Sequence, residues 1–133
     1  MKSSFKMKLS KIQLSQLYIS KQKLAKVNDK FDPQDLSTLG LIPIKKLWNT
    51  IFYTDGHTRA FAAYQAGLTK IPVIWEDDEL DWEMYKICIR WCREEGLFTI
   101  ADLSKRVVTH KNYEILWYKR CENLQNELES EKT

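Results

Sequence analysis

Five consecutive residues, Asp55-Gly56-His57-Thr58-Arg59, combine side chains that can bind and activate an anionic ligand. The guanidinium of Arg59 can hold phosphate oxygens through two parallel hydrogen bonds, and the hydroxyl of Thr58 can donate to the same ligand. The imidazole of His57 can act as an acid or base, because its ordinary pKa lies near neutrality. Gly56 permits a positive φ angle and a close approach of ligand to backbone. We therefore expect Gly56, His57, Thr58 and Arg59 to bind a ligand, with His57 as the candidate catalytic residue.

The neighbouring residues place this motif where a strand ends and a helix begins. The apolar run Ile51-Phe52-Tyr53 predicts a buried strand, and the Ala-rich segment from His57 to Ala66 predicts a helix that ends at Gly67. The first N–H groups of a helix are unpaired and lie at the positive end of the helix dipole. The motif therefore predicts a site for a phosphate or a carboxylate.

Asp55 allows two interpretations. Mg²⁺ commonly binds one or two carboxylates together with phosphate oxygens, so Asp55 is a candidate Mg²⁺ ligand beside a bound nucleotide. Alternatively, Asp55 holds Arg59 in a salt bridge at the start of an ordinary capped helix. The spacing of the two residues does not separate these alternatives.

The rest of the chain predicts an α+β fold in a single domain, residues 1–133, with a small mixed β-sheet and a helical C-terminal third. We expect residues 1–9 to be frayed. Strands are predicted at residues 12–19, 41–48, 50–54 and 71–75, and helices after Ser20, at 57–66, at 80–95, at 101–106 and after Thr109. The five tryptophans are candidates for the core.

Charge and hydropathy limit the partners and the location. The net charge of +3 is too small to indicate nucleic-acid binding by itself, but lysines crowd the first quarter of the chain. This basic flank is either a surface for nucleic acid or an acidic partner, or an ordinary solvated surface. No apolar run is long enough to span a membrane and no signal peptide is present, so we expect a cytoplasmic protein. The oligomeric state is left open.

Cysteines and acidic residues offer further candidate sites. Cys88, Cys92 and Cys121 fit a reducing compartment. Cys88 and Cys92 lie four residues apart on a predicted helix, but their spacing matches no known zinc motif, so we expect core packing and no zinc. The acidic run at residues 76–79 is either a source of a metal ligand or general base, or a solvent-facing helix start, and we favour the second interpretation.

Four blocks of sequence occur in an order and spacing that resemble a known family. The span from Ile12 to about Glu76 is similar to the ParB-like N-terminal domain, whose fold is shared with sulfiredoxin. The matching blocks are Leu41-Ile42-Pro43-Ile44, Asp55-Gly56-His57-Thr58-Arg59-Ala60, Ala66-Gly67-Leu68 and Lys70-Ile71-Pro72-Val73. The resemblance implies a ParB/sulfiredoxin-like unit at residues 12–76 in a small bacterial protein. A helical extension at residues 80–128 lies outside it.

The resemblance implies several chemistries, because this fold supports more than one. Partition ParB proteins bind and hydrolyse CTP, sulfiredoxin binds ATP and attacks a sulfinate, and members with an Asp-Gly-His-His-Arg motif include free-serine kinases. Other members are reported as nucleases. Here His57 replaces the sulfiredoxin-like cysteine, and residues 20–23 lack the glutamate that the kinases place there. The chain after residue 76 is too short for the DNA-binding and dimerisation domains of chromosome-partition proteins.

The combined expectation is a ParB-like protein that binds a nucleotide or another phosphate-bearing ligand at Asp55–Arg59. Slow phosphotransfer or hydrolysis is one form of this function, and the sequence leaves open whether the protein is an enzyme. One alternative is a partner-binding or DNA-associated module with a degenerate site. A metal-dependent nuclease is the weaker alternative, because no dense carboxylate cluster accompanies the motif.

Overall fold

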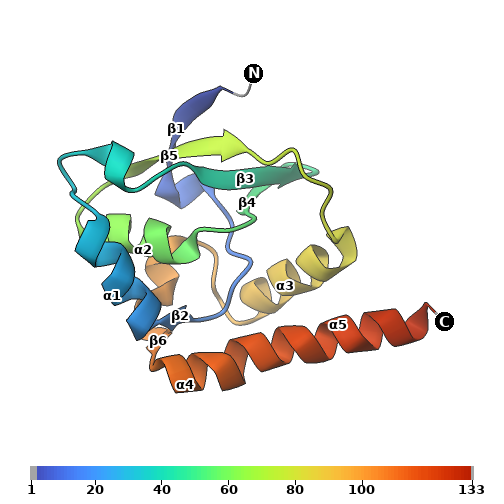
Figure 1. Ribbon diagram of the computed structural model, residues 1–133. Coiled ribbons are helices and arrows are strands. Elements are labelled where there is room, and N and C mark those ends of the chain that lie inside the picture. Colours follow the sequence, from blue (N-terminus) through green and yellow to red (C-terminus); the bar gives the residue numbers. More distant parts are fainter. Residues whose placement is uncertain (1–2, 133) are drawn as a thin grey trace.

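A four-stranded mixed sheet forms one side of the computed structural model, which describes residues 3–132 (Figure 1). The strand order is β1-β5-β3-β4. β3 and β5 are parallel, whereas the β1–β5 and β3–β4 pairs are antiparallel. The strands are β1 (Ser4–Lys8), β3 (Ile42–Leu47), β4 (Thr50–Tyr53) and β5 (Lys70–Trp75). The predicted α+β class with a small mixed sheet is confirmed.

The helix α2 (His57–Gln65) lies under the sheet and is buried at five of its nine residues, and α1 (Lys21–Lys30) runs beside it. Ala60, Ala62 and Ala63 are at most 2% exposed, so these small side chains allow neighbouring elements to approach α2 closely. Ser20 caps α1, because its Oγ accepts a hydrogen bond from the backbone N–H of Lys23 at 3.2 Å.

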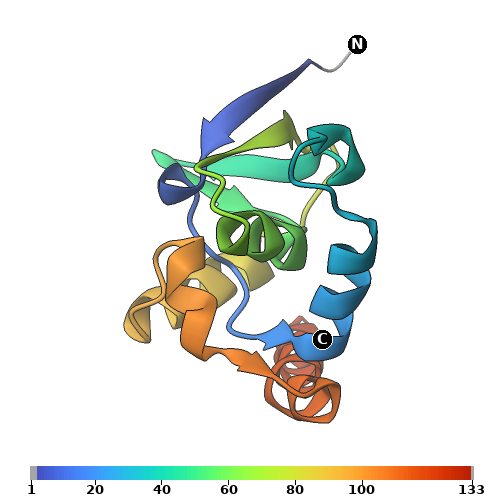
Figure 2. The ribbon, with the colours of Figure 1, turned by 90° about the vertical axis from the view of Figure 1, so that its left-hand side faces the viewer.

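The C-terminal third is helical and packs on the side of α2 away from the sheet. Figure 2 shows α2 between the sheet and the C-terminal helix, which is seen nearly end on. The segments α4, η4 and α5 follow one another without a break, and η4 is a π-helical turn. The elements are α3 (Trp82–Glu94), η3 (Ile100–Lys105), α4 (His110–Tyr113), η4 (Glu114–Tyr118) and α5 (Lys119–Glu131). None of the helices in residues 3–132 could span a membrane.

A short two-stranded parallel ribbon connects the two halves of the chain. It pairs β2 (Ile19–Ser20) with β6 (Val107–Val108). The N–H of Ile19 also donates to the carbonyl of Arg106 at 3.0 Å. The start of α1 is therefore tied to the beginning of the C-terminal helix.

The expected first strand at residues 12–19 is wrong. The expected fraying of residues 1–9 is wrong for residues 4–8, which form β1, and residues 1–2 lie outside the described part of the chain. The apolar residues of the predicted strand are all buried, but only Ile19 belongs to a strand. Gln13 forms an isolated bridge with Phe52. Residues 12–17 cross the interior between β4 and the C-terminal helices, so burial on several sides removes the simple alternation of a surface strand.

Two tryptophans expected in the core lie at the surface. Trp48 is 83% exposed at the tip of the β3–β4 hairpin, and Trp75 is 39% exposed. The φ angle of Trp48 is +54°, because a two-residue hairpin turn needs a positive φ at one of its central positions. Trp117, by contrast, is only 7% exposed.

Candidate functional site

The motif at residues 55–59 starts α2, as the sequence predicts. β4 ends at Tyr53, and α2 begins at His57 directly after Gly56. The φ angle of Gly56 is +84°, and a Cβ there would lie 3.0 Å from Arg59 Nη2 and 3.1 Å from Ile42 Cγ2. Glycine is therefore required here for both its conformation and its size. No side chain of residues 3–132 caps this end of α2, so the N–H groups of its first turn are left for a ligand.

A cleft of about 350 Å³ opens beside the start of α2, and we call it the basic cleft. α2 and the turn before it supply one wall, and α1 supplies Lys23 and Lys26. The basic cleft is lined by Gln16, Lys23, Lys26, Val27, Asp55, Gly56, His57, Thr58 and Arg59. Two lysines, one arginine and one aspartate give this wall a surplus of positive charge.

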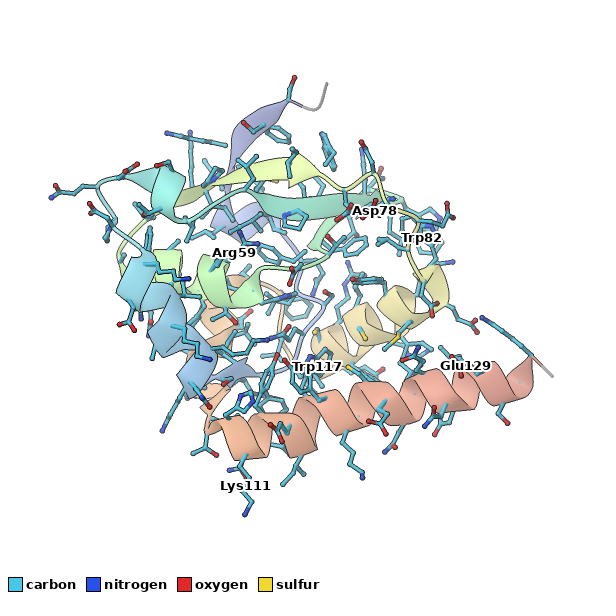
Figure 3. All side chains as sticks on the ribbon, in the orientation of Figure 1. Arg59, Asp78, Trp82, Lys111, Trp117 and Glu129 are labelled. Carbon is cyan, nitrogen blue, oxygen red and sulfur yellow. The ribbon has the colours of Figure 1, made fainter. Side chains whose placement is uncertain are left out.

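Arg59 has a structural role in addition to lining the basic cleft. Its Nη1 donates to the carbonyls of Leu39 at 3.3 Å and Leu41 at 3.1 Å. The guanidinium also lies so close to Gly40 that a Cβ there would be 3.0 Å from Nη1. Figure 3 labels Arg59 between α2 and the sheet. Arg59 therefore fastens the turn before β3, and no salt bridge joins it to Asp55 among the described residues.

His57 is buried, with only 3% of its surface exposed. Its Nε2 accepts a hydrogen bond from the backbone N–H of Ser15 at 3.0 Å, and its ring lies 4.9 Å from the ring of Tyr53 between centroids. Burial lowers the pKa of His57 to about 3, although the charge of Asp55 acts in the opposite direction. Burial thus moves the pKa of His57 well below the ordinary value on which the expected acid–base role rests. Because Nε2 is an acceptor, the single proton of the neutral ring lies on Nδ1.

The backbone around His57 is held by Ser15 and Tyr53. Ser15 donates from Oγ to the carbonyl of Tyr53 at 2.6 Å, so the segment before β2 is fixed to the end of β4. The hydroxyl of Tyr53 is the one buried side-chain oxygen or nitrogen in residues 3–132 that lacks a hydrogen-bond partner. Burial raises the pKa of Tyr53.

A second cavity, of about 220 Å³, adjoins the basic cleft at His57, and we call it the thiol cavity. It shares Gln16, Asp55 and His57 with the basic cleft. Its lining is Ser15, Gln16, Thr54, Asp55, His57, Met84, Tyr85, Cys88, Trp117 and Cys121. Trp117 faces this interior from the C-terminal helix (Figure 3).

The cysteines on α3 pack inward, as the sequence predicts. Cys88 is 5% exposed and Cys92 is fully buried, whereas Cys121 on α5 is half-buried. Cys92 points its Sγ at the carbonyl of Gln16, 3.6 Å away. Within residues 3–132, no three His, Cys, Asp or Glu residues are grouped so that they could hold a metal ion.

Asp55 and Thr58 line the basic cleft with accessible polar groups. Asp55 is exposed and Thr58 is half-buried. Asp55 provides the single carboxylate on this wall, so a cation there would need phosphate oxygens and water as its other ligands. The acidic run at residues 76–79 lines neither cavity. Its backbone carbonyl at Asp78 accepts from Lys45 Nζ at 2.9 Å, which fits a turn rather than a site.

Sequence reasoning did not assign Lys23, Lys26 or Gln16 to the site. The two lysines belong to the basic flank, and that excess of lysine was the available signal. Their position beside the motif depends on the packing of α1 against α2, which no local pattern reports.

Comparison with protein-family models gave no match. No curated protein matches the chain either. The structure has a distant likeness to protein Atu1540 from Agrobacterium tumefaciens, with 11% sequence identity and a TM-score of 0.46. The likeness covers 73% of this chain and 50% of that protein, so the chain spans about half of its length. A likeness at this level is too weak to transfer a function.

Proposed function

We propose that this ParB-like protein binds a phosphate-bearing ligand in the basic cleft, with the anionic group at the N-terminus of α2. The observation that supports the proposal is the position of Lys23 and Lys26, which line the same cleft as the uncapped first turn of α2. Either feature alone would be common on a protein surface. Together they place several donors and a surplus of positive charge beside one cleft, where Lys23 also donates to the hydroxyl of Tyr118 at 2.8 Å.

Each donor in the basic cleft has a distinct part in this proposal. The first N–H groups of α2 point along the helix dipole toward the anion. Thr58 offers a hydroxyl, and Lys26 is exposed and able to move toward the ligand. The neutral ring of His57 can donate from Nδ1 without carrying a charge.

A nucleotide is the ligand class that we propose. The volume of about 350 Å³ lies in the range of small-molecule sites. The resemblance to ParB-like proteins favours the same class. Bound Mg²⁺ would use Asp55 together with phosphate oxygens, since the cleft has one carboxylate.

Binding is favoured over acid–base catalysis. A general acid or base works best when its pKa lies near the working pH, whereas the pKa of His57 is about 3. The Nε2 atom of His57 is also occupied by the N–H of Ser15. Slow phosphotransfer or hydrolysis would therefore have to use Asp55 or the ligand itself. The three free thiols fit a reducing compartment, and we propose a cytoplasmic location.

Calorimetric titration with inorganic phosphate, pyrophosphate, ATP, ADP, CTP and GTP, with and without Mg²⁺, tests the proposal. Lys26→Gln should weaken binding of the best ligand by about 10- to 100-fold, the usual effect of losing one charged hydrogen bond. Lys30→Gln is the matched control, because Lys30 is exposed on the same helix and does not line the cleft. Absence of binding to the wild type, or equal weakening by both variants, would favour the partner-binding alternative.

A further inference from the structure

Two cysteines from different helices meet in the thiol cavity. Cys88 comes from α3 and Cys121 from α5, and both line the same 220 Å³ space. Each thiol contributes to the pKa shift of the other, which places the two side chains close to each other within this cavity. A disulfide needs the two Cβ atoms to come within about 4.5 Å, and the proposal below requires the pair to reach that geometry. No property of the proposed ligand site requires this pair.

The two thiols have unequal environments. Cys88 is only 5% exposed, whereas Cys121 is half-buried and follows the charged Arg120. The neighbouring thiol of Cys88 and the charge of Arg120 lower the pKa of Cys121, against the effect of burial. The proximity of Cys121 and burial raise the pKa of Cys88. Cys121 is therefore the sulfur that more readily loses its proton, and Cys88 remains a thiol beside it.

We propose that Cys88 and Cys121 are a thiol–disulfide site that reacts with peroxides and is restored by dithiol reductants. The thiolate of Cys121 attacks one oxygen of hydrogen peroxide, which breaks the O–O bond and gives a Cys121 sulfenic acid and hydroxide. The sulfur of Cys88 then attacks the Cys121 sulfur, and the departing hydroxide takes the Cys88 proton. Two thiols and one peroxide thus yield one disulfide and two waters, because the proton first lost by Cys121 neutralises the first hydroxide.

Cys92 does not take part in this site. It lies one helical turn from Cys88 on α3, is fully buried and does not line the thiol cavity. Its Sγ is directed at the carbonyl of Gln16, and burial raises its pKa to about 12. Cys92 therefore serves as the internal control. It is a cysteine of the same core, but it does not share the thiol cavity with a second cysteine and is closed to peroxide.

Mass spectrometry of the folded, full-length protein during titration with hydrogen peroxide tests the proposal. The wild type and Cys92→Ser should each lose two hydrogen masses, and peptide mapping should show a Cys88–Cys121 link that dithiothreitol reverses. Cys88→Ser should stop at a Cys121 sulfenic acid that dimedone traps. Circular dichroism before oxidation shows whether each variant is folded.

Three results would overturn the proposal. These are no disulfide in the folded wild type, a link that uses Cys92, and a link that appears only in denaturant. If Cys88→Ser fails to fold, the wild type and Cys92→Ser still test the proposal, because peptide mapping of these two proteins identifies which cysteines are linked.

Discussion

The basic cleft and the thiol cavity meet at His57, and they differ in the elements that supply the rest of their lining. The basic cleft is walled by lysines, a hydroxyl and the start of α2, and much of it faces solvent. The thiol cavity takes half of its lining from the C-terminal helices, namely Met84, Tyr85, Cys88, Trp117 and Cys121. Substitutions of the exposed cleft lysine Lys26 should therefore change ligand binding, whereas substitutions of the buried rings of the thiol cavity should change stability.

His57 shows how the two sides depend on each other. Its place at the start of α2 comes from the motif, but its burial comes from Ser15, Tyr53 and the elements around the thiol cavity. The ring is consequently neutral and fixed in one tautomer. The sequence position of His57 suggests acid–base chemistry, whereas in the folded protein its side chain is a buried hydrogen-bonding group.

The largest expected effect is a loss of stability when a buried tryptophan, rather than an exposed one, is replaced by alanine. Trp117→Ala removes a buried ring from the thiol cavity and should lower the free energy of unfolding by about 3–5 kcal/mol. Trp48→Ala, at an 83% exposed position, should change it by less than about 1 kcal/mol. Urea denaturation measures both values. Equal losses would show that Trp117 does not support the cavity.

The pH dependence of stability should report the burial of His57. The unfolded chain binds a proton near the ordinary pKa of 6.5, whereas folded His57 binds one only near pH 3. The unfolded state therefore holds more protons between these values, and stability should fall as the pH is lowered, by about 3 kcal/mol from pH 7 to pH 4. His57→Gln should remove this part of the slope, and His110→Gln should retain it. Matching slopes for the two variants in urea denaturation would contradict the buried, neutral ring.

Arg59 should affect both binding and stability, unlike Lys26. Arg59→Ala removes the charged donor from the carbonyls of Leu39 and Leu41, which should lower the free energy of unfolding by about 1.5–3 kcal/mol. The same change should weaken ligand binding by about 10-fold or more. Lys26→Gln should weaken binding alone. Urea denaturation and calorimetry on the same preparations separate the two effects, and an Arg59→Ala protein of unchanged stability would rule out the structural role.

The smallest expected effect is the difference in stability cost between alanine at Gly56, in the basic cleft, and alanine at Gly67, outside it. Gly56 and Gly67 have nearly the same φ angle, +84° and +87°, but a Cβ at Gly67 would meet no atom within 4 Å. Gly67→Ala should therefore cost about 1 kcal/mol from backbone conformation alone. Gly56→Ala should cost more, by up to about 1 kcal/mol, because its Cβ meets Arg59 and Ile42. Thermal unfolding compares the two, and equal losses would mean that the contacts at Gly56 relax freely.

Local elements with strong signals were predicted well from the sequence. The β3–β4 hairpin and the helix from His57 to its end before Gly67 match the prediction to within about a residue. The inward packing of Cys88 and Cys92 on α3 also follows from the sequence. Each of these features depends on residues close together in the chain, such as an alanine run or a helical stripe.

Features that depend on distant partners were not predicted. β1 exists because Ser4–Lys8 pairs with Lys70–Trp75, and no pattern within the first eight residues reports that partner. Residues 12–17 do not form the expected strand, because Gln13 makes a single isolated bridge with Phe52 and no ladder of paired residues continues from it. Trp48 lies outside because the hairpin turn places it there, although its type favours the core.

Neighbouring residues are enough to place Asp55-Gly56-His57-Thr58-Arg59 at the start of a helix. The packing of distant elements is needed to bring Lys23 and Lys26 beside that motif, to bury His57 in its neutral form, and to put Cys121 in the same cavity as Cys88. The physical reason is that a helix start is specified by neighbouring residues. Burial, pKa and contacts between helices depend instead on what the distant parts of the chain bring to the same place.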